Sequence, residues 1–185
     1  MTVPIRRALT AAAVLLVPAL LVGSTASAGA ASRSFDDPAA DVRQGVDLER
    51  VTVVYGERWL KIRTHHRNLV PRPPYSAGMS VFLDTDRSDP GPELRFGTGL
   101  MDGTDYSLMT TEGFAPSRDG DFVRCDYRLR LDYARDVARL RLAPGCVGGV
   151  ASVRVAVKAA AEQGRLRAYD WLGEKRSFTD AVPRG

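Results

Sequence analysis

Four carboxylates gather in a turn-rich stretch of the sequence: Asp84, Asp86, Asp89 and Glu93. Calcium takes about six to eight oxygen ligands, and alternate acidic residues in a loop can provide several of them. Arg87 interrupts the cluster, and the glycine required by an EF-hand loop is missing from its position. Capping of backbone amides before the following Pro-Gly turn is the competing interpretation. A calcium site at this loop is therefore a hypothesis, and the sequence indicates no other cofactor.

Arginines form a second group of residues that could bind a ligand. They alternate with apolar residues between positions 123 and 142, which predicts two strands with one basic, exposed face. Like charges opposite each other on neighbouring strands are destabilising unless an anion or an acidic side chain compensates them. A cell-surface polyanion is one such partner, and a solvated face that includes Asp126 and Asp132 is the other interpretation. The arginines are Arg124, Arg128, Arg130, Arg139 and Arg141.

Trp59 is the third candidate. A two-residue turn at Gly56-Glu57 would pair Val53 with Leu60, and it would place Val54 and Trp59 together on an otherwise polar face. An exposed indole offers a flat apolar surface on which a sugar ring can stack. Alternatively, the proline-rich segment nearby covers the indole. We assign the other tryptophan of the chain to the core.

Catalytic chemistry finds no support in the sequence. His65 and His66 are the only histidines, and adjacent residues of a strand point to opposite faces, so the two cannot easily share a metal. The sequence contains no G-x-S-x-G motif, and no spacing places two carboxylates across a cleft. We therefore predict a protein that is not an enzyme.

A predicted hairpin positions the arginines. Residues 123–133 alternate without interruption, residues 138–142 alternate again, and a four-residue loop between them would set Tyr133 opposite Ala138. Continuing that register places Cys125 opposite Cys146, the only two cysteines of the chain. We predict a disulfide between them, worth about 3 kcal/mol in the chain-entropy model.

The first 28 residues are typical of a secretory signal peptide. Arg6 and Arg7 precede an apolar run over residues 11–22, and Ala26-Ser27-Ala28 fits a cleavage signal. Removing this segment lowers the net charge from +4 to +2, because it carries two arginines and no acidic residue. We therefore expect an extracellular protein without a membrane span and without a nucleic-acid partner.

The rest of the chain predicts a single all-β domain. An acidic lead-in occupies residues 29–46, and residues 47–185 contain eight or nine short strands separated by Gly-, Pro- and Asp-rich turns. Short strands at regular spacing, without a convincing helix, are typical of an antiparallel β-sandwich or jelly roll.

Several segments carry a resemblance to known proteins: Val46–Val53, Phe82–Asp86, Gly91–Glu93, Cys125 with Arg128–Tyr133, and Phe178–Val182. Together they resemble a group of uncharacterised secreted proteins of actinobacteria, which implies export and an all-β fold. The acidic lead-in before a hairpin and the LDTD strand end are similar to the jelly rolls of CBM9-like carbohydrate-binding modules, which implies a binding role.

We therefore expect a secreted, non-catalytic domain that binds a carbohydrate or a cell-envelope polymer through Trp59 and the arginines. The alternative is an extracellular protein-interaction or inhibitor-type module. In that case the loop over residues 71–75 or the loop over residues 113–120 would be inserted into a partner protein.

Overall fold

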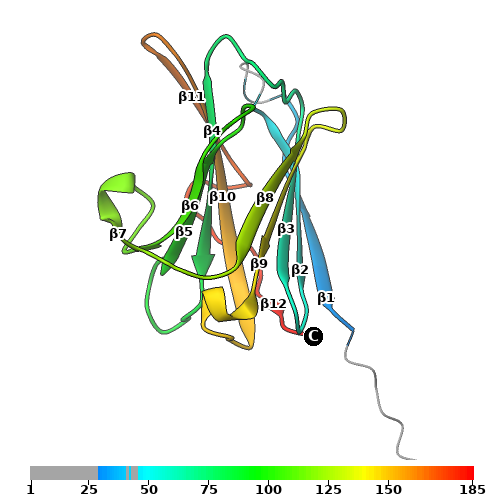
Figure 1. Cartoon of the computed structure of the whole chain (residues 1–185), viewed down its shortest axis with the longest axis vertical. Helices are drawn as coiled ribbons and strands as arrows, with labels where there is room; N and C mark the ends of the chain where they lie inside the picture. Colours follow the sequence, from blue (N-terminus) through cyan, green and yellow to red (C-terminus); the bar gives the residue numbers. More distant parts are fainter. Residues whose placement is uncertain (1–28, 41, 43–45) are drawn as a thin grey trace, which may run out of the picture.

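Two antiparallel β-sheets pack face to face in a computed structural model that describes residues 29–40, 42 and 46–185 (Figure 1). The predicted signal peptide, residues 1–28, lies outside the described residues. The prediction of an antiparallel β-sandwich is confirmed, and the described residues contain no α-helix.

One sheet has five strands in the order β1-β2-β3-β9-β8. The other has the order β11-β10-β4-β5-β6-β7, with the short β12 also paired to β10. The strands of the first sheet are β1 (Ala31–Asp36), β2 (Leu48–Tyr55), β3 (Leu60–His66), β8 (Tyr127–Asp132) and β9 (Val137–Leu142). Those of the second are β4 (Ser76–Asp84), β5 (Leu94–Gly99), β6 (Tyr106–Thr111), β7 (Asp119–Phe122), β10 (Ser152–Gln163), β11 (Leu166–Trp171) and β12 (Val182–Pro183).

The core lies between the sheets and is built from the alternate apolar residues of each strand. Val51, Val53 and Tyr55 of β2 face the interior together with Leu60 and Ile62 of β3, and each is at most 1% exposed. Full burial of such side chains stabilises the fold by about 1.5–3 kcal/mol each. The residues between them remain on the outer face of the sheet, where a ligand can reach them.

The predicted register of the β2–β3 hairpin is wrong by two residues. Val53 pairs with Ile62 and Tyr55 pairs with Leu60, so the connection has four residues, and the Gly56 N–H donates to the Trp59 carbonyl at 3.1 Å. A shift of two residues leaves every side chain on its own face, so alternation alone could not detect the error.

The predicted register of the β8–β9 hairpin is also wrong by two residues. Leu129 pairs with Leu140, and the connection covers residues 133–136 rather than 134–137. Asp136 adopts a left-handed conformation (φ 53°) in this connection. Its side chain accepts a hydrogen bond from the Leu69 N–H at 2.7 Å, and its carbonyl accepts one from the His66 N–H, which fixes the turn.

The predicted disulfide is confirmed although the register behind it was wrong. Cys125 and Cys146 are bonded, with their Cα atoms 5.5 Å apart. Cys146 does not continue β9; it lies in a short 3₁₀ helix, η2 (Pro144–Val147), in which its N–H donates to the Ala143 carbonyl. This tight turn shortens the path by the two residues that the predicted register had misplaced.

The acidic lead-in is more ordered than the sequence suggested. Residues 31–36 form β1, the edge strand of the five-stranded sheet, with Phe35 opposite Val51. Asp36 accepts a hydrogen bond from the side chain of Arg50 on β2. The lead-in predicted to precede the domain therefore contributes a strand to it.

Candidate functional site

Six cations form two rows on the outer face of the five-stranded sheet, and we call these six residues the basic face. In one row Lys61 of β3 is opposite Arg141 of β9, and Arg141 is opposite Arg128 of β8. Two residues further along the strands, a second row repeats the arrangement (Figure 1 shows the three strands side by side). From the spacing of strands and of alternate residues, the six Cα atoms cover roughly 10 by 7 Å. The second row consists of Arg63, Arg139 and Arg130.

Little negative charge compensates the basic face. Asp132 accepts hydrogen bonds from Arg139 at 2.9 Å and from Arg135 at 3.1 Å. Within the described part of the chain, the other five members of the basic face have no ion pair. Like charges directly opposite each other in a sheet are destabilising, so this arrangement costs the free protein stability.

The basic face is slightly hollowed. A concavity of about 540 Å³ is lined by its six cations and, on the β1 and β2 side, by Ser32, Thr52 and Val54. Val54 is paired with Lys61 across the strands, so this predicted ligand-binding residue lies beside the basic face. The concavity therefore combines a small apolar and hydroxyl surface with a wall of guanidinium groups.

Trp59 lies at one end of the basic face, in the β2–β3 connection. The predicted pair of Trp59 with Val54 is absent because of the register shift, and Val54 faces Lys61 instead. The guanidinium carbon of Arg141 lies 4.5 Å from the centre of the indole ring. Trp59 is half-buried, so only part of the indole is open to a ligand.

Four of the five predicted arginines belong to the basic face, and Arg124 does not. It precedes β8, outside the paired residues, although it is exposed. Sequence reasoning missed Lys61 and Arg63 as site residues. Their alternation with buried neighbours was visible, but nothing in the sequence showed that β3 lies beside β9.

The positive charge of the basic face also affects the pKa of His65. His65 follows Arg63 on the outer side of β3. Burial lowers the pKa of its imidazole below the usual value, and the charges of Arg63, Arg50 and Arg139 lower it further. The imidazole is therefore mostly neutral at pH 7 and adds no further charge to this surface.

The carboxylates of the calcium hypothesis are engaged in separate contacts. Asp84 is buried and forms an ion pair with Arg154 of β10. Glu93 accepts hydrogen bonds from the backbone N–H and the hydroxyl of Thr85, at 2.5 and 3.0 Å. Both side chains thus fix the ends of the loop between β4 and β5.

Asp86 caps the turn that follows it. Its side chain accepts hydrogen bonds from the N–H and hydroxyl of Ser88, which lower the pKa of Asp86, while Asp89 is exposed. No group of three or more His, Cys, Asp or Glu side chains suited to a metal ion occurs among residues 29–40, 42 and 46–185. The predicted calcium ligands are therefore not brought together.

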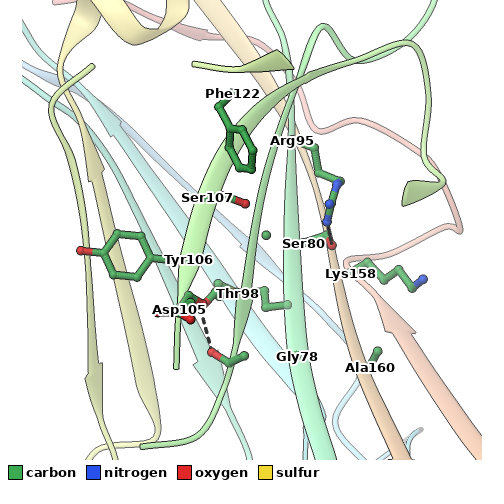
Figure 2. Close-up of a pocket in the computed structure, with 13 residues that line it drawn as sticks. Gly78, Ser80, Arg95, Thr98, Asp105, Tyr106, Ser107, Phe122, Lys158 and Ala160 are labelled. Atoms are coloured by element: carbon green, nitrogen blue, oxygen red, sulfur yellow. Dashed lines mark hydrogen bonds between the residues drawn. The ribbon is translucent and has the colours of Figure 1, made fainter. Parts of the chain in front are cut away.

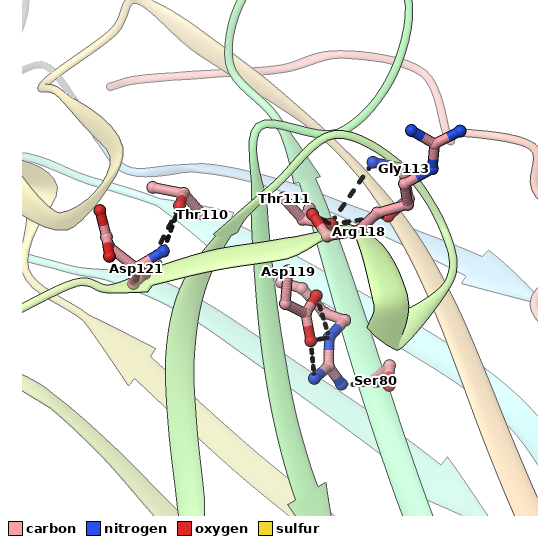
Figure 3. Close-up of polar contacts among 8 residues, drawn as sticks. Ser80, Thr110, Thr111, Gly113, Arg118, Asp119 and Asp121 are labelled. Atoms are coloured by element: carbon pink, nitrogen blue, oxygen red, sulfur yellow. Dashed lines mark hydrogen bonds and ion pairs between the residues drawn. The ribbon is translucent and has the colours of Figure 1, made fainter.

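The opposite sheet carries a groove that the sequence did not reveal. A concavity of about 650 Å³ has small residues along its floor and the exposed ring of Phe122, 68% exposed, at one side (Figure 2). Arg95 lies along the floor, where it donates hydrogen bonds to Asp119 and to Ser80, the two residues drawn close together in Figure 3. Asp119 neutralises Arg95, so this guanidinium adds no uncompensated charge to the floor of the groove.

Trp171 is not in the core between the sheets, contrary to prediction. Its ring stacks on Phe82 with centroids 5.9 Å apart, and the ring of Phe114 packs edge-on against it at 5.7 Å. Trp171 is half-buried in this cluster on the outside of the seven-stranded sheet. The cluster anchors the loop before β7 and forms a wall beside the groove.

No protein-family model and no characterised protein matches this chain. No helix in the described residues is long and apolar enough to cross a membrane.

Proposed function

We propose that this chain is a secreted, non-catalytic domain that binds an anionic polymer of the cell envelope on its basic face. The observation that supports this most strongly is the pair of cross-strand rows, in which five of six cations have no ion pair within the described residues. Secretion rests on the signal peptide predicted for residues 1–28.

The chemistry of the six side chains suits repeated anionic groups. Five of them are arginines, whose planar guanidinium groups can bind a carboxylate or a phosphate through two parallel hydrogen bonds. A sheet holds these groups at fixed spacing, so a polymer with regularly repeated charges can contact several at once. A bound anion also relieves the repulsion between cations on neighbouring strands, and this relief adds to the free energy of binding.

Trp59 has a supporting role in this proposal. Its contact with Arg141 orients that guanidinium, which lies between Lys61 and Arg128 in its row. The part of the indole that remains exposed can contact a sugar ring of the polymer. We therefore expect Trp59 to add affinity for a polysaccharide over a simple polyanion.

The loops suggested for a protein-interaction module have less support. The loop over residues 113–120 is held by Phe114, whose ring lies 5.0 Å from Phe82 and 5.7 Å from Trp171. In the proline-rich segment, Tyr75 packs against the core. Neither loop leaves its aromatic side chain free for insertion into a partner.

A sedimentation assay with insoluble polysaccharides and purified cell wall tests the proposal. We expect the mature protein to pellet at low salt and to be released at high salt, because surface charges are screened. The variant Arg63→Ser/Arg128→Ser should pellet poorly at low salt. The control Arg87→Ser/Arg165→Ser removes the same charge from exposed residues away from the basic face and should behave as the wild type.

Equal pelleting of both double variants would exclude the basic face as the binding surface. If no polymer pellets the wild type at either salt concentration, the proposed function is wrong. Loss of binding in Trp59→Ala that salt does not reproduce would show that stacking, and not charge, is the dominant interaction.

A further inference from the structure

We propose a second ligand-binding site, for an acidic saccharide, in the groove on the outer face of the seven-stranded sheet. The site lies on the opposite sheet from the basic face and is independent of the function proposed above. Its centre is Lys158 of β10, which lines both concavities of this face, one of about 650 Å³ and one of about 630 Å³.

The two concavities have Lys158 in common. A single row of cross-strand partners runs from β11 to β6, and all its members beyond Lys158 are small. With strands about 4.8 Å apart, this row is roughly 19 Å long. Its members are Trp171, Lys158, Ser80, Gly97 and Ser107. The guanidinium of Arg95 lies over Gly97 and donates a hydrogen bond to Ser80, so it forms the middle of a floor that is long enough for several sugar rings.

Uncompensated positive charge lies at one end of the groove. Lys158, Lys175 and Arg176 line the same concavity, and none of the three has an ion pair among the described residues. The one acidic side chain in this lining, Asp170, is buried and accepts a hydrogen bond from the Leu48 N–H, on the inner side of the sheet.

The half-buried position of Lys158 makes this charge unusual. Burial lowers the pKa of its ammonium group, and the charges of Arg176, Arg95 and Lys175 lower it further. A half-buried cation among like charges is stabilised by a bound anion. The ligand should therefore carry a carboxylate, sulfate or phosphate at this end of the groove.

Aromatic rings flank the same lysine. Its Nζ lies 4.3 Å from the centre of the Tyr169 ring and 5.8 Å from that of Trp171. Tyr169 is 50% exposed, and stacking on Phe82 holds Trp171 in place. Flat, fixed aromatic surfaces beside hydrogen-bonding groups are suited to the apolar faces of sugar rings. Because cationic groups and aromatic rings lie together around Lys158, the ligand that fits is a sugar that carries a negative charge.

Calorimetric titration with three short oligosaccharides tests the site: a uronic acid tetramer, a sulfated tetramer and a phosphorylated tetramer, each beside its uncharged parent or methyl ester. We expect at least one acidic oligomer to bind at least tenfold more tightly than its uncharged counterpart. Binding should weaken at least fivefold in Lys175→Ser/Arg176→Asn and in Tyr169→Ser. Asparagine is chosen at 176 because Arg176 has a positive φ of 63°, which asparagine tolerates.

The basic-face variant Arg63→Ser/Arg128→Ser separates the two proposals, because it keeps Lys175, Arg176 and Tyr169 and should still bind the acidic oligomers through the groove. The second site would be overturned if none of the three oligomers binds, or if the groove variants bind as tightly as the wild type. It would also be overturned if only the basic-face variant loses binding. Thermal unfolding of each variant checks that the fold is intact.

Discussion

Acidification should destabilise this fold through one buried side chain, His66. The ring is 2% exposed, its Nδ1 lies 3.2 Å from the Val46 carbonyl, and its Nε2 lies 2.8 Å from the Thr64 hydroxyl. Because a carbonyl only accepts, Nδ1 carries the proton, and Nε2 of the neutral ring accepts from Thr64. Burial lowers the pKa of His66 to about 4.

The size and sign of the effect follow from that pKa. In the unfolded chain the pKa of a histidine is about 6.5, so between pH 6.5 and pH 4 the unfolded state binds more protons than the folded state. Stability therefore decreases as the pH falls through this range. For His66 the loss is about 2 kcal/mol between pH 7 and pH 5.

Urea unfolding at pH 7, 6 and 5, followed by tryptophan fluorescence, measures this loss. His66→Gln should be less stable than the wild type at pH 7, since it disturbs two buried hydrogen bonds, but it should lose most of the pH dependence. His65→Gln is the matched control. The ring of His65 is more exposed than that of His66, so this variant should keep most of the pH dependence of stability. If His66→Gln keeps the full pH dependence of the wild type, the buried neutral histidine is not its source.

Three further changes probe the scaffold. Cys125→Ala/Cys146→Ala removes the cross-link between two residues that are 21 positions apart in the sequence. It should lower the free energy of unfolding by about 3 kcal/mol, measured by urea unfolding beside the reduced wild type. Asp119→Asn leaves the largely buried Arg95 without its charged acceptor and should cost about 2 kcal/mol in the same assay; an unchanged midpoint would show that the pair is not stabilising. Arg130→Glu places an acidic side chain opposite Arg139 and should raise stability by about 0.2–1 kcal/mol, a gain that high salt removes.

Alternation in the sequence was sufficient to predict the strands and their faces. Leu129, Leu131 and Leu140 were assigned inward and their arginine neighbours outward, as the structure has them. It was not sufficient for register, because a shift of two residues exchanges no faces. The disulfide was still predicted correctly. The error of two residues in the register is offset by the 3₁₀ turn, which brings Cys146 back to Cys125.

The order of the strands in each sheet was the other feature that the sequence could not predict. The basic face depends on β3 lying next to β9, a contact between segments some 75 residues apart in the chain, as in the pair Arg63 and Arg139. Nothing local to either segment indicates that neighbour. The groove depends on five strands that each contribute one residue of the row, Lys158 among them, so its residues formed no motif in the sequence.

The central claim is that the basic face binds an anionic polymer, and the salt dependence of binding tests it most directly. The logarithm of the binding constant for a soluble polyuronate, plotted against the logarithm of salt concentration, has a slope that reports the number of cations contacted; on the relation known for nucleic acids each contributes about 0.7–0.9. Arg63→Ser/Arg128→Ser should reduce the magnitude of that slope by about 1 to 2, while Arg87→Ser/Arg165→Ser should leave it unchanged. Equal slopes for the two double variants would contradict the claim.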